Sequence, residues 1–204
     1  MKRSIVVLVA MLLSVFWLQS CTEKKQPEQV KRNVQYVSGP DEVTYLKLGK
    51  EIIDTVGNTL KSNLMKAMQE NGPVSAVKFC NLQAMELTGI YSEKYGTELR
   101  RVTDRNRNPL NEANATELEV MNDFRGIQKQ GRPVLPKVVI DADGKKNFYA
   151  PIFTGAACLT CHGAKENMQP ELVTAIDSLY PNDNAKNYSI DELRGLWSIK
   201  FKNS

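Results

Sequence analysis

The sequence predicts an α+β fold in which helices come first and antiparallel strands follow. Apolar residues recur at helical spacing through residues 41–95. Strand-like segments are concentrated after residue 136, and a hairpin turn signal separates the first two. The composition, with 42% hydrophobic and 25% charged residues among 204, is that of an ordinary soluble protein. Such a separation of helices from strands along the chain is typical of the α+β class.

Three longer helices are expected. The first covers residues 41–70 and is stopped by Asn71-Gly72-Pro73. The second runs from Pro73 to about Tyr95. The third covers residues 115–130, with Asn114 as its cap and Glu117 as the capping-box partner. One face of the second helix is formed by Val77, Cys80, Ala84, Leu87 and Tyr91.

The strands and short helices follow from local patterns. A short strand is expected at residues 97–103, before an Asn- and Arg-rich loop over 104–114. Strands at 137–140 and 145–154 flank the turn signal Asp141-Ala-Asp-Gly144. A closing strand with alternating side chains covers 195–202. Short helices are expected around residues 158–166 and over 170–179.

The N-terminus has the pattern of an export signal. Lys2 and Arg3 precede an apolar run over residues 5–18, which is shorter than a typical transmembrane helix. The run ends in Leu18-Gln19-Ser20-Cys21, which is similar to the lipobox of bacterial lipoproteins, where the cysteine is lipidated and becomes the mature N-terminus. The alternative is an uncleaved anchor helix. In both cases the rest of the chain is exported.

These features predict three parts of the chain. Residues 1–20 are a lipoprotein signal peptide, residues 21–40 a lipidated N-terminus with a polar tether, and residues 41–204 a single folded domain. We therefore expect a membrane-anchored lipoprotein that faces the periplasm or the cell exterior. A net charge of only +4 argues against a nucleic-acid partner.

The rare residues limit the chemistry. The chain has one histidine, His162, and four cysteines, Cys21, Cys80, Cys158 and Cys161. A single histidine excludes metal sites built from several histidines. It also limits the chain to one histidine-dependent centre.

The segment Cys158-Leu-Thr-Cys161-His162 has the spacing of c-type haem attachment. Its two thiols suit addition to the two vinyl groups of a haem, and the adjacent histidine suits binding of the iron from one face. We therefore predict one covalent haem c. The alternatives are a thioredoxin-like redox pair, a zinc site completed by Cys80, and a structural disulfide. The redox pair lacks its usual βαβ context, and the zinc site lacks a second closely spaced ligand pair.

The sixth iron ligand is left open by the residues alone. A second histidine is excluded, so Cys80, a methionine, a lysine, a tyrosine, the N-terminal amine and an open position remain. Cys80 has an alternative role as a small apolar core residue of its helix. Cys80 and a methionine are equally favoured at this point. The methionines of the mature chain are Met65, Met68, Met85, Met121 and Met168.

Several segments resemble the single-haem c-type cytochrome family with a PAS-like sensor fold, described in cyanobacteria. The similarity covers residues 46–201. It rests on Ala76-Val-Lys-Phe-Cys80, Arg101-Val-Thr103, Arg107-Asn-Pro109, Cys158-Leu-Thr-Cys-His-Gly163, Tyr180-Pro-Asn-Asp-Asn-Ala185 and Glu192-Leu-Arg-Gly195. The resemblance implies an antiparallel sheet flanked by helices, and an axial pair that maps onto His162 and Cys80. The sequence departs from the family pattern at Asp104, where a serine is expected.

Other residues are candidates for contacts with the cofactor. Arg101, Arg105 and Arg107 suit the haem propionates, because a guanidinium matches carboxylate geometry; a solvated basic loop is the alternative for each. Four aromatic residues are candidates for the pocket wall, and at least half of them are expected to fill the ordinary core instead. These are Tyr149, Phe153, Trp197 and Phe201.

Together these observations predict an exported monohaem c-type cytochrome that transfers single electrons or senses redox state. The alternative is a haem-based gas or redox sensor that signals to a separate partner. We expect no enzymatic activity, because the sole histidine is used on iron and none is left as an acid–base catalyst. The expected partners are a redox protein of unknown identity and, through the lipid anchor, a membrane.

Overall fold

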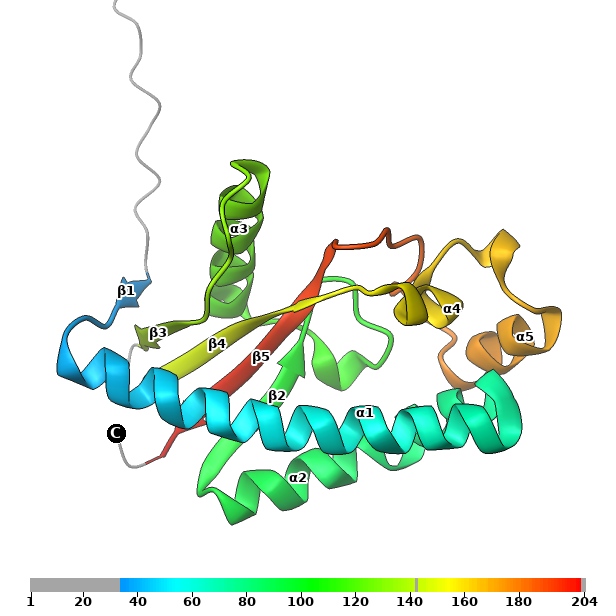
Figure 1. Ribbon diagram of the computed structural model, residues 1–204, viewed down its shortest axis with the longest axis horizontal. Coiled ribbons are helices and arrows are strands. Elements are labelled where there is room, and N and C mark those ends of the chain that lie inside the picture. The colour runs from blue at the N-terminus through cyan, green and yellow to red at the C-terminus, as the bar shows by residue number, and fades with distance from the viewer. Residues whose placement is uncertain (1–33, 142, 203–204) are drawn as a thin grey trace, which may run out of the picture. The chain divides into compact units, whose positions relative to one another are not determined.

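The computed structural model describes residues 34–141 and 143–202, which form a five-stranded antiparallel sheet with helices on both faces (Figure 1). The strand order is β1-β3-β4-β5-β2. The strands are β1 (Gln35–Tyr36), β2 (Thr97–Val102), β3 (Lys137–Ile140), β4 (Lys146–Phe153) and β5 (Leu193–Phe201). The helices are α1 (Pro40–Leu82), α2 (Ala84–Lys94), α3 (Ala115–Lys129), α4 (Leu159–His162) and α5 (Pro170–Leu179).

The predicted α+β class is confirmed, and most predicted elements lie within two residues of their expected bounds. The hairpin of β3 and β4 forms around the predicted turn, with Lys137 opposite Tyr149. The capping box of α3 is present: Asn114 Oδ1 accepts from the Glu117 amide, and Glu117 Oε2 accepts from the Asn114 amide. Three short 3₁₀ helices add to the predicted elements, at Pro109–Asn111, Ala156–Cys158 and Lys165–Asn167.

The predicted stop at residues 71–73 appears as an interruption of α1. Gly72 has φ 75° and ψ −178°, a conformation that is essentially restricted to glycine, and Pro73 follows it. We call residues 40–71 the first segment of α1 and residues 73–82 the second segment. The predicted second helix, from 73 to 95, is divided at Gln83, which has φ −110° and ψ −28°. This division starts α2 at Ala84, a residue that is 1% exposed.

Strand β1 lies among the residues that the sequence assigns to the polar tether. In β1, Gln35 pairs with Ile140 and Tyr36 with Val139, and the flanking Val34 and Val37 are buried. So short a strand has no periodicity of its own, because its burial depends on the partner strand β3. The expected signal peptide and the lipidation site at Cys21 lie outside the described residues. None of the described helices is long and apolar enough to cross a membrane.

Each face of the sheet has its own core. The first segment of α1 lies along one face, where its apolar side chains pack against alternate residues of the strands. There, Gly49 allows close approach, since a Cβ atom at this position would lie 2.3 Å from the Phe148 ring. On the other face, Val120, Met121 and Phe124 of α3 pack against Val102 and Leu196, and all five are at most 1% exposed.

A third, smaller cluster brings the two ends of the site together. Val77, on the second segment of α1, packs against Leu172 and Ile176 of α5 and against Tyr180. Cys161 packs against the same cluster. The helix that carries Cys80 is thereby held next to the segment that carries the C-x-x-C-H motif.

Candidate functional site

The motif occupies a short 3₁₀ turn and the single-turn helix α4. Cys158 ends the 3₁₀ turn, and Cys161 and His162 belong to α4. The loop before β5 holds this segment through two backbone hydrogen bonds, from the Asn187 amide to the Gly163 carbonyl and from the Tyr188 amide to the His162 carbonyl, each 2.9 Å. The position of the motif is thus fixed by a segment about 25 residues further along the chain.

His162 is oriented by a carbonyl group. Its Nδ1 lies 2.7 Å from the carbonyl oxygen of Ala185, which can only accept, so Nδ1 carries the proton and donates. Nε2 is then the nitrogen with a free lone pair. Burial and the charges of Arg107 and Arg194 lower the pKa of His162 to about 3. The imidazole is therefore neutral near pH 7, the form that ligates a metal.

Arg107 joins the motif to the loop that orients His162. Its Nε and Nη2 donate to the two carboxylate oxygens of Asp183, at 3.2 and 3.1 Å. Nη2 also donates to the carbonyl of Cys161 at 2.5 Å and to that of Ala185 at 3.3 Å. The side chains of Arg107 and Asp183 are 10% and 4% exposed. These partners make Arg107 a positioning residue, which differs from the expected contact with a haem propionate.

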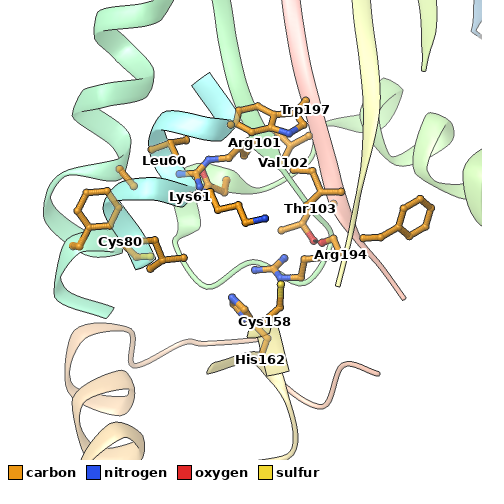
Figure 2. A pocket seen from close by; sticks show the side chains of 18 residues that line it. Leu60, Lys61, Cys80, Arg101, Val102, Thr103, Cys158, His162, Arg194 and Trp197 are labelled. Atoms are coloured by element: carbon orange, nitrogen blue, oxygen red, sulfur yellow. Dashed lines mark hydrogen bonds between the residues drawn. The ribbon is translucent and has the colours of Figure 1, made fainter. Parts of the chain in front are cut away.

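Two adjoining cavities, of about 300 and 210 Å³, lie between the two segments of α1, the sheet and the C-x-x-C-H motif. Figure 2 shows the larger of the two. Together they lie within the range of sites that hold a small organic cofactor. Cys80 reaches the cavities from α1, and Cys158 and His162 reach them from the motif. The residues that line both cavities are Leu64, Cys80, Arg101, Thr103, Asn111, Cys158, His162 and Arg194.

Cys80 is a half-buried thiol at the cavity wall. Burial raises its pKa, and the positive charges of Arg101 and Arg107 partly offset this effect. Two of the methionine candidates, Met68 and Met85, line the smaller cavity. Met121 is fully buried in the α3 core, and Met168 packs against the α5 cluster. Of the cysteine and methionine candidates, Cys80, Met68 and Met85 therefore line the cavities that His162 also lines, as do Lys61 and Tyr180 of the other candidate types.

Most of the predicted site residues meet at these cavities, and a few do not. Cys161 and Arg107 line the smaller cavity, and Phe153 and Trp197 line the larger one. Tyr149 and Phe201 belong to the two cores instead. Arg105 points elsewhere: it pairs with Glu192 at 2.8 Å, and its guanidinium lies 3.9 Å from the centre of the Tyr188 ring.

Sequence reasoning missed two cations that line the larger cavity, Lys61 and Arg194. Arg194 lies at an irregularity of β5, where Ile152 pairs with Gly195 but Phe153 pairs with Leu193. The alternating pattern of a strand does not reveal such a bulge. The available signal was the segment Glu192-Leu-Arg-Gly195, which contributed to the family resemblance without a role.

The arrangement does not favour the zinc alternative. Cys80, Cys158 and Cys161 are free thiols. Among residues 34–141 and 143–202, no group of three or more His, Cys, Asp or Glu side chains is close enough to hold a metal ion. Cys80 therefore does not complete a compact four-ligand set with the motif, as a structural zinc site requires.

A family model described as Tll0287-like matches residues 19–202 of the chain. This protein belongs to the Tll0287-like family. Among solved structures, this protein is similar to the crystal structure of the cyanobacterial heme-protein Tll0287. The TM-score is 0.58 and the sequence identity 20%, over 82% of this chain and 98% of that chain. At this identity the likeness establishes the shared fold. No curated protein matches the sequence.

Proposed function

We propose that this chain is an exported monohaem c-type cytochrome that transfers single electrons. Haem c is attached through Cys158 and Cys161, with His162 as the proximal ligand and Cys80 as the sixth ligand. The observation that carries the proposal is the placement of the motif: both thiols and the neutral, oriented imidazole of His162 line the smaller cavity, which adjoins the larger one. The relative of similar fold is described as a heme-protein, which supports the choice of cofactor.

The residues present fit such a cofactor. Bound haem supplies one-electron chemistry at its iron, and each thioether forms when a cysteine S–H adds across a vinyl group, with no oxidant required. The chain contributes the carbonyl of Ala185, which keeps Nδ1 protonated and Nε2 free. Arg107 donates both to that carbonyl and to the carbonyl of Cys161 in the motif, and its pair with Asp183 holds the guanidinium in place. Apolar side chains, including Leu64 and Trp197, line the cavity.

Cys80 is the preferred sixth ligand because it lines both cavities, as His162 does, whereas Met68 and Met85 line only the smaller one. Burial raises the pKa of Cys80, and Arg101 and Arg107 offset only part of this effect, so binding to the iron would be what deprotonates the thiol. A thiolate ligand stabilises ferric iron, so we expect a lower reduction potential than that of a His/Met cytochrome.

The fold supports a PAS-like assignment through its strand order. The first long strand, β2, lies beside the last, β5, and β4 and β3 follow on the other side of β5. We include in the proposal that Cys21 is lipidated and anchors the exported domain to a membrane. The further partner is a redox protein, and neither a nucleic acid nor an enzymatic substrate is expected.

The first experiment tests covalent attachment. The chain is expressed with its own N-terminus in a bacterial host that has the c-type haem maturation machinery. We expect one haem per chain that resists acid–acetone extraction, and its loss from Cys158→Ala and Cys161→Ala. A secreted, folded protein without haem, or with haem that the solvent extracts, would contradict the proposal.

The second experiment identifies the sixth ligand. Cys80→Ser is compared with Met68→Leu and Met85→Leu by low-temperature EPR and redox titration. We expect only Cys80→Ser to abolish the low-spin thiolate signature and to raise the reduction potential. An unchanged Cys80→Ser spectrum, with a change in one methionine variant, would assign the ligand to that methionine.

A sensor is the second candidate, favoured by the position of Cys80. The second segment of α1 lies between the interruption at Gly72 and the one at Gln83, and it packs against α5. A change in Cys80 ligation would therefore act on a helical segment with a break at each end. Six-coordination in both oxidation states supports the electron carrier, and loss of the Cys80 signature on reduction supports the sensor.

A further inference from the structure

We propose that Arg194 and Arg101 form a dicarboxylate-binding subsite that holds the two propionates of the haem, an inference that rests on the function proposed above. Both guanidinium groups lie at the wall of the two cavities, and Figure 2 shows Arg194 above Cys158 and His162. Arg194 has no role in the sequence-based prediction.

The backbone of β5 directs Arg194 into the cavity. Ile152 pairs with Gly195 and Phe153 with Leu193, so Arg194 is an extra residue on β5. A bulge of this kind turns a side chain away from the regular alternation of a strand. Gly195 permits it, since a Cβ atom there would lie 2.5 Å from the carbonyl oxygen of Val102 on β2.

Arg194 and Arg101 differ from the neighbouring arginines in their partners. Arg100, Arg105, Arg107 and Arg125 each have a carboxylate oxygen within 3.4 Å. In the described part of the chain, no carboxylate pairs with Arg101 or Arg194. Arg194 donates only Nη1, to the Arg105 carbonyl at 3.3 Å, and its buried Nε has no hydrogen-bond partner among the described residues. Arg101 lies 5.9 Å from the centre of the Trp197 ring.

Two unpaired cations beside one cavity require an anion. Burial lowers the pKa of Arg101 and of Arg194, but an arginine side chain stays protonated in proteins. A buried charge without a counter-charge is strongly unfavourable, and a guanidinium binds a carboxylate through two parallel hydrogen bonds. A cofactor with two carboxylates satisfies both groups at once, whereas the carboxylate of Asp183 is already taken by Arg107.

The subsite also acts on the iron. Positive charge near the cavity disfavours the ferric form, which carries one more charge than the ferrous form. Arg194 therefore opposes the effect of a thiolate at Cys80. Its removal is expected to lower the reduction potential further.

The test compares Arg194→Gln, Arg101→Gln and Arg194→Lys, with Arg125→Gln as the matched control. Arg125 loses the same charge, but its partner is Asp104 at the surface. Measurements are the covalent haem content, the reduction potential, and the propionate bending bands in resonance Raman spectra of the ferrous protein. We expect each Gln variant to shift the ferric–ferrous equilibrium about tenfold toward the ferric form, about 59 mV for a one-electron couple. One propionate band should shift in each.

Arg194→Lys keeps the charge but not the paired hydrogen bonds, so its potential should stay near that of the unmodified protein while its propionate band moves. Arg125→Gln should change neither the reduction potential nor the propionate bands. Loaded Gln variants with unchanged potentials and bands, or an equal shift in the Arg125→Gln control, would overturn the proposal. If Arg194→Gln disturbs the bulge and does not fold, Arg101→Gln tests the proposal by the same measurements. An unmodified protein without covalent haem would instead refute the proposed function.

Discussion

The two segments of α1 belong to one helix but serve different parts of the molecule. In the first segment, Ile52, Val56 and Leu60 pack against the sheet, and all are at most 6% exposed. In the second segment, Val77 packs against α5, and Cys80 lies at the edge of the first core, where it also lines the cavities. Gly72 separates the two environments. The first segment also lines the larger cavity through Leu60, Lys61 and Leu64. Core residues that line neither cavity, such as Phe148, therefore predict a different response to mutation from residues of the site.

The largest expected effect is a loss of protein stability when the core beneath the first segment is altered. Phe148→Ala removes a ring that is 0% exposed and packed beneath Gly49. We expect the free energy of unfolding to fall by about 3–5 kcal/mol, because a large cavity is left behind. Urea unfolding measures this loss. The haem absorption spectrum of the folded fraction should stay unchanged, and an altered ligand spectrum would contradict the separation of the two segments.

Asp183→Asn is expected to lower the free energy of unfolding less than Phe148→Ala does, but to disturb the site more. Burial alone raises the pKa of Asp183, but its hydrogen bond with Arg107 and the charge of Arg107 outweigh burial and hold this pKa below its ordinary value. Removing the carboxylate charge leaves Arg107 unpaired and should cost about 2 kcal/mol. Because Arg107 also holds the Ala185 carbonyl, we expect the EPR signal of the His162-ligated iron to become heterogeneous.

The matched control for this change is Asp177→Asn. Asp177 pairs with Lys165 at 2.8 Å, but both side chains are about half exposed, so the pair contributes little. Equal effects of the two substitutions on the EPR signal would show that Asp183 has no special role in orienting the histidine.

Gly72→Ala tests the boundary between the segments. The backbone conformation at Gly72 is nearly restricted to glycine, so we expect Gly72→Ala to cost about 1–3 kcal/mol in local backbone strain, although no atom beyond the adjacent residues lies within 4 Å of the added Cβ atom. The strain should move the second segment and change the Cys80-dependent EPR signal. Gly89→Ala is the control: it lies on the exposed face of α2 in open space, where alanine should stabilise the helix.

The sequence predicted the parts of this molecule that depend on local chemistry. The capping box at Asn114, the stop before Pro73 and the C-x-x-C-H motif each consist of neighbouring residues, and the first two are confirmed. The features that it missed depend on distant partners. The strand β1 needs β3, and the bulge at Arg194 appears only when β5 is placed beside β4. Likewise, Asp183 and Ala185, which accept from Arg107, lie in a loop more than 70 residues away.

The smallest expected effect concerns Asp104, the position where this sequence departs from the family pattern. Burial alone raises the pKa of Asp104, but its hydrogen bond and ion pair with Arg125 of α3 outweigh it and leave a pKa below the ordinary value. Since both side chains are about 30% exposed, solvent screens the pair, and Asp104→Ser should cost less than about 1 kcal/mol.

The pH dependence of Asp104→Ser gives the sharper criterion. A carboxyl group with a lowered pKa in the folded state stabilises the protein fully above its unfolded pKa, and this contribution disappears as the pH falls through the folded pKa. The difference in unfolding free energy between Asp104→Ser and the unmodified protein should therefore be constant near pH 7 and disappear as the pH falls through the folded pKa of Asp104, which lies below its ordinary value. Urea unfolding as a function of pH measures it. A difference that persists in acid would mean that Asp104 acts through packing rather than charge, and a changed haem spectrum would show that Asp104 belongs to the site.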